Sequence, residues 1–277
     1  MASSGKTNNE DAFQQQGFLG KGWATLSNAL QALTLSATRA QYYIAALGSP
    51  TPGFTTLHVA ASQGDLRVVE QLLENGATIN VDTKAANGQA SIHLAAAYGH
   101  TEVVKVLLDK GADIHAADIT GCTALYWAAS EGHAEVVEVL LDKGADIHAA
   151  DITTYTALHR AASGGHAEIV KVLLDKGADI HIADFAKRTA LHWAASEGQV
   201  EVVKVLLDKG ADIHATDIIK HTALHLAAKG GQEEAVKMLL EYGANREEKT
   251  SRGHTALDLA RTESVVRLLS PAGTGLS

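Results

Sequence analysis

Fourteen histidines are the residues of this 277-residue chain that most directly invite chemistry, because imidazole nitrogen is a common metal ligand. Seven of them fall in two columns with a 33-residue spacing: His100, His133 and His166, and His115, His148, His181 and His214. A zinc ion holds nitrogen ligands at about 2.0–2.1 Å, whereas equivalent residues of stacked helical units stand about 8–10 Å apart. Two such histidines cannot share an ion without distortion, so we expect structural histidines and neither a metal nor another cofactor.

Motifs of catalysis are missing from the sequence. It has no Cys-x-x-Cys pair, no His-Glu-x-x-His, no Gly-x-Ser-x-Gly and no complete phosphate-binding loop. The single cysteine, Cys122, stands in no activating arrangement, so we expect a surface thiol there and not a nucleophile. The expected protein is therefore not an enzyme.

The elements that position these residues recur every 33 residues. One complete unit spans residues 118–150, and residue 151 begins it again. The period is visible in two columns: Leu125, Leu158, Leu191, Leu224 and Leu257, and Gly144, Gly177, Gly210 and Gly243. A fixed period of this length indicates an array in which each unit buries its apolar face only by stacking on its neighbours.

The recurring motif resembles the ankyrin repeat. It reads Thr123-Ala-Leu-Tyr126, Thr156-Ala-Leu-His159 and Thr189-Ala-Leu-His192, followed by paired alanines and Gly-His or Gly-Gln. The resemblance covers roughly residues 53–269 and recurs in register about seven times. It implies an all-α solenoid of helix pairs joined by β-hairpin loops. It also implies structural hydrogen bonding for the motif histidines, which are His58, His93, His159, His192 and His225.

Four segments are expected along the chain. Residues 1–19 form a flexible N-terminus, 20–48 a capping helix or helices, 49–270 the array and 271–277 a flexible tail. The units of the array are expected at about 53–85, 86–117, 118–150, 151–183, 184–216, 217–249 and 250–270. The last unit has lost several residues, which we place between its helices, as a terminal capping unit would show.

The segment 20–48 permits two interpretations. Its apolar residues recur at spacings of three and four from Trp23 to Leu47, which predicts an amphipathic helix. This helix either covers the exposed apolar face of the first unit or pairs with a second copy through its heptad spacing. Whether it is one helix or a hairpin that breaks near residues 34–36 stays open.

Two departures from the repeated pattern carry expectations. Ala90 stands where other units have the capping threonine, at a cost of about 1 kcal/mol unless Ser91 substitutes for it. Thr154, Lys187 and Lys220 replace the turn glycine seen at Gly121. If that position needs a positive φ, each replacement adds strain of order 1 kcal/mol, and we expect these hairpin tips to be more mobile or differently shaped.

Charge and composition exclude several partners. The formal net charge of −9 argues against nucleic acid, whose binding domains are usually strongly basic. No run of 18 apolar residues exists, so we expect no membrane span. The polar N-terminus and the single cysteine favour a cytoplasmic protein, with a signal-independent bacterial export route left open. We expect a monomer in preference to a dimer.

Differences between the units gather at the hairpin tips and first helices, while the second helices of units three to five are nearly identical. The varied residues are the candidate contacts for a partner: Tyr98, Ile119, Thr120, Cys122, Trp127, Ser130, Glu131, Ile152, Thr153, Tyr155, Arg160, Ser163, Phe185, Arg188, Trp193, Ser196, Glu197, Ile218, His221, Leu226 and Lys229. Trp, Tyr and Arg dominate binding hot spots, and six of the candidates are of these types. The alternative is that the tryptophans pack between helices and the apolar tips cover neighbouring hairpins.

These observations predict a non-enzymatic module that binds another protein. The resemblance places the binding surface on the concave face, where hairpin tips and first helices lie. The alternative function is a structural scaffold that associates with itself through residues 20–48.

Overall fold

The computed structural model describes residues 53–74 and 79–270, all within one compact unit of the chain, Thr51–Ser277. The expected segments 1–19, 20–48 and 271–277 lie outside the described residues. Over the described ranges the chain forms fourteen α-helices in seven pairs, joined by hairpin loops. Strand pairing there is limited to two isolated antiparallel bridges, Ala117–Thr123 and Ala150–Thr156. The predicted all-α solenoid is confirmed.

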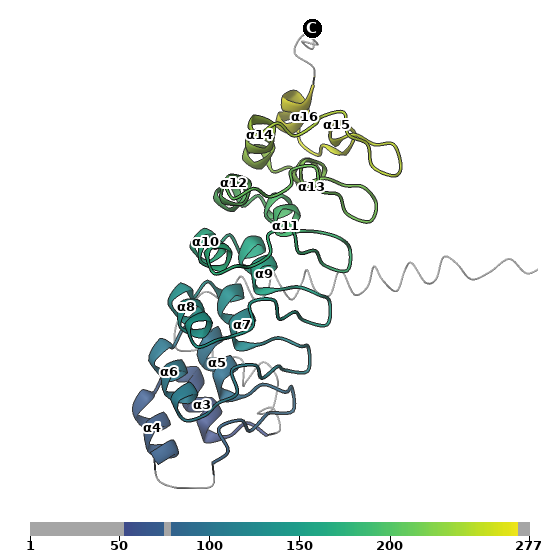
Figure 1. Ribbon diagram of the computed structural model, residues 1–277. Helices are drawn as coiled ribbons and strands as arrows, with labels where there is room; N and C mark the ends of the chain where they lie inside the picture. Colours follow the sequence, from purple (N-terminus) through teal and green to yellow (C-terminus); the bar gives the residue numbers. More distant parts are fainter. Residues whose placement is uncertain (1–52, 75–78, 271–277) are drawn as a thin grey trace, which may run out of the picture. The chain divides into compact units, whose positions relative to one another are not determined.

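The helices stand in two rows, and the hairpin loops project from the side of the inner row (Figure 1). The inner row consists of α3 (Thr56–Gln63), α5 (Ser91–Ala97), α7 (Ala124–Glu131), α9 (Ala157–Gly164), α11 (Ala190–Glu197), α13 (Ala223–Gly230) and α15 (Ala256–Leu259). The outer row consists of α4 (Leu66–Glu74), α6 (Thr101–Asp109), α8 (Ala134–Asp142), α10 (Ala167–Asp175), α12 (Val200–Asp208), α14 (Glu233–Glu241) and α16 (Glu263–Leu269). Each helix contacts the next helix of its own row and its partner within the unit.

The last unit is shortened at a different place from the one expected. Its inner helix α15 has four residues where α13 has eight, and it ends in extended backbone at Ala260. The missing residues therefore belong to the inner helix itself and not to the connection between the helices.

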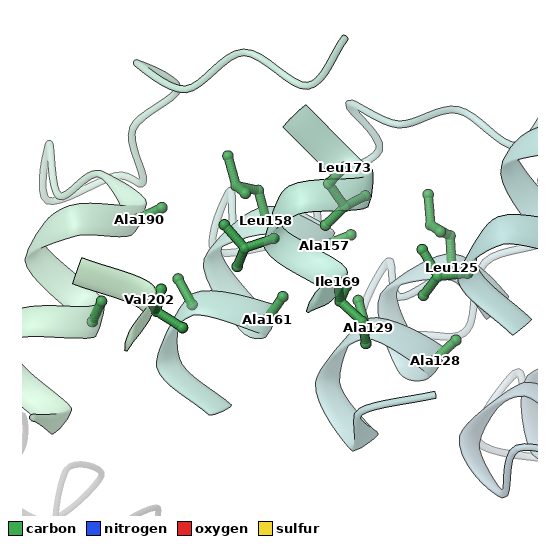
Figure 2. Close-up of a cluster of buried hydrophobic side chains, with 14 of the residues drawn as sticks. Leu125, Ala128, Ala129, Ala157, Leu158, Ala161, Ile169, Leu173, Ala190 and Val202 are labelled. Atoms are coloured by element: carbon green, nitrogen blue, oxygen red, sulfur yellow. The ribbon is translucent and has the colours of Figure 1, made fainter. Parts of the chain in front are cut away.

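The core is a continuous layer between the two rows. Figure 2 shows Leu125, Leu158, Ile169 and Leu173 from neighbouring units in one buried cluster. Paired alanines, such as Ala128 and Ala129 on α7, are fully buried, and their small side chains let successive inner helices approach closely. Because each unit completes the burial of the next, the stability of one unit depends on its neighbours.

Both backbone conformation and space require glycine at Gly132, which ends α7. Gly132 has a φ of 89°, which an L side chain rarely adopts. A Cβ there would also lie 2.7 Å from the His166 ring of the next unit. That ring approaches because its Nε2 donates to the Ser130 carbonyl, 3.2 Å away. In the following unit Gln199 makes the same contact with the carbonyl of Ser163 at 3.1 Å.

Four of the five motif histidines join their unit to the next. The Nδ1 of His159 accepts from the backbone N–H and the hydroxyl of Thr156, at 3.2 and 3.0 Å. Since a peptide N–H can only donate, the proton of the neutral ring sits on Nε2, which donates to the Arg188 carbonyl at 3.2 Å. The same bridge recurs at His58, His192 and His225, whereas the Nε2 of His93 donates to the Ala116 carbonyl within its own unit. The structural role implied by the resemblance is thus confirmed.

One detail of helix capping differs from expectation. In units with a motif histidine the threonine hydroxyl contacts the imidazole, whereas Thr123 and Thr255 accept a backbone N–H as predicted. In the second unit the N–H of Ala90 still donates to His93 Nδ1 at 3.0 Å. The Ser91 hydroxyl is buried and has no hydrogen-bond partner among the described residues, so it does not substitute for the missing threonine.

The turn position at the hairpin tips is left-handed, so the condition for strain at the replaced glycines is met. Its φ is 82° at Gly121 and 63°, 59° and 62° at Thr154, Lys187 and Lys220. The expectation of differently shaped tips is wrong, because the residue at this position donates its N–H to an aspartate carbonyl in all four hairpins: Asp118, Asp151, Asp184 and Asp217. The carboxylate of each aspartate accepts two further backbone N–H groups of its hairpin, which holds the shape whatever residue occupies the turn.

The buried histidines predict a loss of stability in mild acid. Burial lowers the pKa of all five motif histidines below the ordinary value. The unfolded chain takes up these protons near pH 6.5, and the folded chain only at lower pH. The contribution is therefore complete above about pH 6.5 and is lost as the pH falls below it.

Urea unfolding at pH 7.5, 6.5 and 5.5 checks this expectation. The free energy of unfolding should fall between pH 6.5 and 5.5, before most carboxylates titrate. A control variant, His148→Gln, removes an exposed histidine and should leave the pH dependence unchanged. A free energy that is flat or rises towards pH 5.5 would contradict the proposed role.

Candidate binding surface

The varied residues of units three to six lie along the inner helices and the hairpin tips. Trp127, Arg160, Trp193 and Leu226 occupy one half-buried column on α7, α9, α11 and α13. At the tips, the apolar side chains are largely exposed: Ile119 at 69%, Ile152 at 75%, Phe185 at 66% and Ile218 at 60%. The alternative in which these tip residues cover neighbouring hairpins is therefore wrong.

Aromatic rings and guanidinium groups from three units interlock on this surface. We call Tyr126, Tyr155, Arg160, Arg188 and Trp193 the aromatic–arginine cluster. The Arg160 guanidinium carbon lies 5.2 Å from the Tyr126 ring centre and 5.1 Å from that of Tyr155. The Arg188 guanidinium lies 4.0 Å from the Trp193 ring and donates to the Tyr155 hydroxyl at 2.9 Å. These cation–π contacts hold the rings in fixed positions before any partner arrives.

Two hairpin aspartates, Asp151 and Asp184, accept hydrogen bonds from the side chains of the cluster. The Asp184 carboxylate accepts from Trp193 Nε1 at 3.2 Å and from Arg188 Nε at 3.1 Å. The Asp151 carboxylate accepts from the Tyr126 hydroxyl at 2.9 Å and lies 3.8 Å from Arg160 Nη2. Burial raises the pKa of Tyr155 to about 12, so its phenol stays protonated. Tyr126 is 4% exposed and supports the cluster from within, while Tyr155, Arg160, Arg188 and Trp193 are half-buried and reach the surface.

Sequence reasoning missed Tyr126. Its hydroxyl joins Asp151 to Arg160, whose Nε donates to it. The signal was present, because Tyr126 stands where every other unit from the first to the sixth has the motif histidine. Burial raises its pKa as well, so it remains a neutral phenol.

Two candidates are corrected by their burial. Cys122 is 4% exposed, and burial raises the pKa of its thiol to about 11, so the expected surface thiol is wrong. His221 is 8% exposed, and its Nδ1 donates to the Asp217 carboxylate at 3.0 Å. The Cys122 sulfur accepts from the Thr120 hydroxyl at 3.2 Å, and neither side chain offers a partner much surface.

The other polar candidates divide by what already occupies them. The Thr120 and Thr153 hydroxyls donate to the aspartates of their hairpins, both at 2.6 Å. Tyr98, Ser130, Ser163 and Ser196 are half-buried on the inner helices, and Glu131, Glu197 and Lys229 are exposed near the ends of those helices. Their role as contacts stays a prediction.

The described residues form neither a metal site nor a helix that could cross a membrane. Within residues 53–74 and 79–270, no group of three or more His, Cys, Asp or Glu side chains could hold a metal ion. The column from His115 to His214 is exposed in every unit. No helix of these ranges is both long and apolar enough to cross a membrane.

Comparison with known proteins identifies the family to which this architecture belongs. The family described as ankyrin repeats (3 copies) matches residues 57–151, 149–217 and 215–275. The chain belongs to the ankyrin repeat family. Among solved structures, the human ASB11 ankyrin repeat domain is 31% identical, with a TM-score of 0.72, over 79% of this chain and 99% of that one. The ankyrin repeat domain of Bcl-3, described as a unique member of the IkappaB protein family, is 32% identical, with a TM-score of 0.67 and the same coverage.

Comparison with curated proteins gives no match for this ankyrin repeat protein. Ankyrin repeat domains are typically non-catalytic modules for protein–protein interaction. The coarse function of the array follows from its family, while its partner does not.

Removing the Tyr126 hydroxyl should destabilise this ankyrin repeat array. In Tyr126→Phe the Oδ2 atom of Asp151, whose side chain is 7% exposed, loses its hydrogen bond from the phenol, while the donors to Oδ1 remain. An unsatisfied buried group costs about 1–3 kcal/mol, so the free energy of unfolding in urea should fall by about that amount.

Tyr242→Phe is the matched control for this measurement. The Tyr242 hydroxyl also donates to an aspartate, Asp208, but the ring is exposed. Its removal should change the free energy of unfolding by no more than about 0.5 kcal/mol. Equal effects of the two substitutions would show that the cluster is not a connected network.

Proposed function

We propose that this protein binds a protein partner on its concave face, through the inner helices and hairpin tips of residues 118–249, and that it carries out no catalysis. The observation that carries the proposal is the aromatic–arginine cluster. It holds three of the residue types that dominate binding hot spots in a fixed arrangement across three units. Side chains that are ordered in advance lose little conformational entropy on binding.

The outer face of the array supports this assignment by contrast. Lys143, Lys176 and Lys209 pair with an aspartate of the preceding unit at 2.8, 2.7 and 2.6 Å, each on an exposed part of the outer helices. Exposed pairs of this kind contribute about 0–1 kcal/mol each. The outer helices α8, α10 and α12 have nearly the same sequence, whereas the hairpin tips differ in each of units three to six. The inner helices vary less: α7 and α11 differ only at Tyr126 and His192, while α9 has Arg160 where both have tryptophan.

Polar residues complete the proposed surface around its centre. Ser130, Ser163 and Ser196 continue the inner helices beyond the cluster, and Glu131, Glu197 and Lys229 lie at its edge. A polar rim of this kind excludes water from the central contacts and contributes little affinity itself. We propose a protein partner and no nucleic acid, with the array acting as a monomer.

Affinity capture from a cell lysate, read by mass spectrometry, tests the proposal. The intact protein is compared with a triple variant, Trp127→Ala, Arg160→Ala and Trp193→Ala, whose folding is confirmed by circular dichroism. Hot-spot residues cost about 2 kcal/mol or more each when truncated, so the affinity for the captured partner should fall at least about 100-fold.

The control variant is Lys143→Ala, Lys176→Ala and Lys209→Ala on the outer helices, which should keep full affinity. Partners that remain bound to the triple inner variant at unchanged affinity would refute the concave site. A protein that captures nothing and sediments as a dimer would favour the alternative of self-association through residues 20–48.

A further inference from the structure

A row of apolar side chains runs along the hairpin tips, and its chemistry narrows the partner further. We call Ile119, Ile152, Phe185 and Ile218 the tip row; they are the four most exposed large apolar side chains of the described residues. The row is confined to four units, because the corresponding residues of the flanking hairpins are Ala86 and Ser251. Isolated exposed apolar residues are common, but a continuous row of them marks an interaction surface.

Backbone hydrogen bonds connect neighbouring hairpins of the tip row in two pairs. The N–H of Ile152 donates to the Thr120 carbonyl at 2.9 Å, and the N–H of Ile218 donates to the Ala186 carbonyl at 3.0 Å. Each tip is also closed internally by its aspartate. Ile119 and Ile152 therefore project from one bonded pair of neighbouring loops, and Phe185 and Ile218 from another.

Two lysines beside the tip row occupy strained backbone. Lys187 and Lys220 have φ values of 59° and 62°, where glycine would be unstrained. Both side chains are exposed, and neither has a hydrogen bond or ion pair with another described residue. The aspartate of each hairpin holds this backbone conformation through its hydrogen bonds to backbone N–H groups. Here the strained residue places an unpaired cation at the tip.

The hairpin aspartates nearest these lysines are buried and already have hydrogen-bond partners. The Asp184 carboxylate is buried and accepts from Arg188 and Trp193, and the Asp217 carboxylate is buried against His221. The tips of units five and six thus present positive charge on a chain whose net charge is −9. Carboxylates on a partner would be attracted to Lys187 and Lys220, whereas a basic partner would be repelled.

We propose that the tip row, with Lys187 and Lys220, binds an acidic amphipathic α-helix of the protein partner. This inference rests on the proposed function and specifies its partner. Neighbouring units stack at about the helix-packing distance of 8–10 Å. An α-helix returns to the same face every seven residues, which is about 10.5 Å, and so presents one apolar residue to each tip. A β-strand presents same-face residues about every 6.6 Å, which does not match the spacing of about 8–10 Å between neighbouring units.

The probe for this proposal is a displayed library of random 28-residue peptides, selected on the full-length protein in solution. Enriched peptides should be acidic, with apolar residues at a seven-residue period, and should become helical on binding. Their dissociation constants should rise about 10-fold or more in a variant with Ile152→Ser and Phe185→Ser.

Charge and strain are separated by two further variants. Lys187→Gln with Lys220→Gln removes the charge and should weaken binding about 10-fold at low salt, with a smaller salt dependence. Lys187→Gly with Lys220→Gly should weaken binding equally while the protein unfolds at a higher urea concentration, so that lost binding is not lost folding. The matched control, Lys171→Gln with Lys204→Gln on α10 and α12, removes two exposed charges from the outer row and should bind like the unaltered protein.

Several results would overturn the proposal. These are a library that yields no peptide, enriched peptides without acidic residues, and binding that is indifferent to the tip lysines. Sedimentation with phosphatidylserine vesicles that is lost in the Ile152→Ser and Phe185→Ser variant would also overturn it, because the tips would then serve a membrane.

The captured partner separates this inference from the proposed function. The first case is a partner that is lost from the Trp127, Arg160 and Trp193 variant but kept by two tip variants, Ile152→Ser with Phe185→Ser and Lys187→Gln with Lys220→Gln. Such a partner refutes the helix at the tips and leaves the concave site standing. A partner kept by all three variants refutes both.

Discussion

A buried imidazole that bonds to its own helix and to the next unit is the contact on which the array depends. In the fourth unit His159 accepts from Thr156 and donates to the Arg188 carbonyl of the fifth unit. The polar groups involved lie inside the stack, where an unmade hydrogen bond would cost about 1–3 kcal/mol. The spacing between units is therefore set by the framework. Residues on the inner surface can change without altering that spacing, and a varied surface on an invariant stack becomes possible.

In the third unit a residue at a framework position also forms part of the candidate binding site. Tyr126 replaces the motif histidine there and directs its hydroxyl to Asp151 and Arg160, residues of the next unit. The link between units is kept, but it is now made by side chains that also shape the surface. The aromatic–arginine cluster begins at this substitution and extends through Tyr155 to Trp193. A framework position has been converted into part of the candidate binding site.

The period, the helix ends and the left-handed turns could all be predicted from the sequence, because each depends on local chemistry that recurs in register. The burial of Cys122 and His221 could not, since it depends on side-chain contacts within the folded hairpin: the thiol with the Thr120 hydroxyl and the imidazole with the Asp217 carboxylate. The same aspartate explains why Lys187 and Lys220 leave the hairpin shape unchanged: its carboxylate bonds to backbone N–H groups and ignores the side chain at the turn. Contacts between units, such as Tyr126 with Arg160, lie about one repeat apart in sequence and become visible only when the units are stacked.

The central claim is that one face of an otherwise uniform stack is fitted to a partner. Hydrogen exchange of the backbone amides, measured on the full chain with and without its captured partner, tests it most directly. The account predicts slower exchange at the hairpins and inner helices of residues 118–131, 151–164, 184–197 and 217–230. It predicts unchanged exchange in the outer helices α8, α10 and α12. Protection that falls on those outer helices, or only outside residues 118–249, would contradict the account.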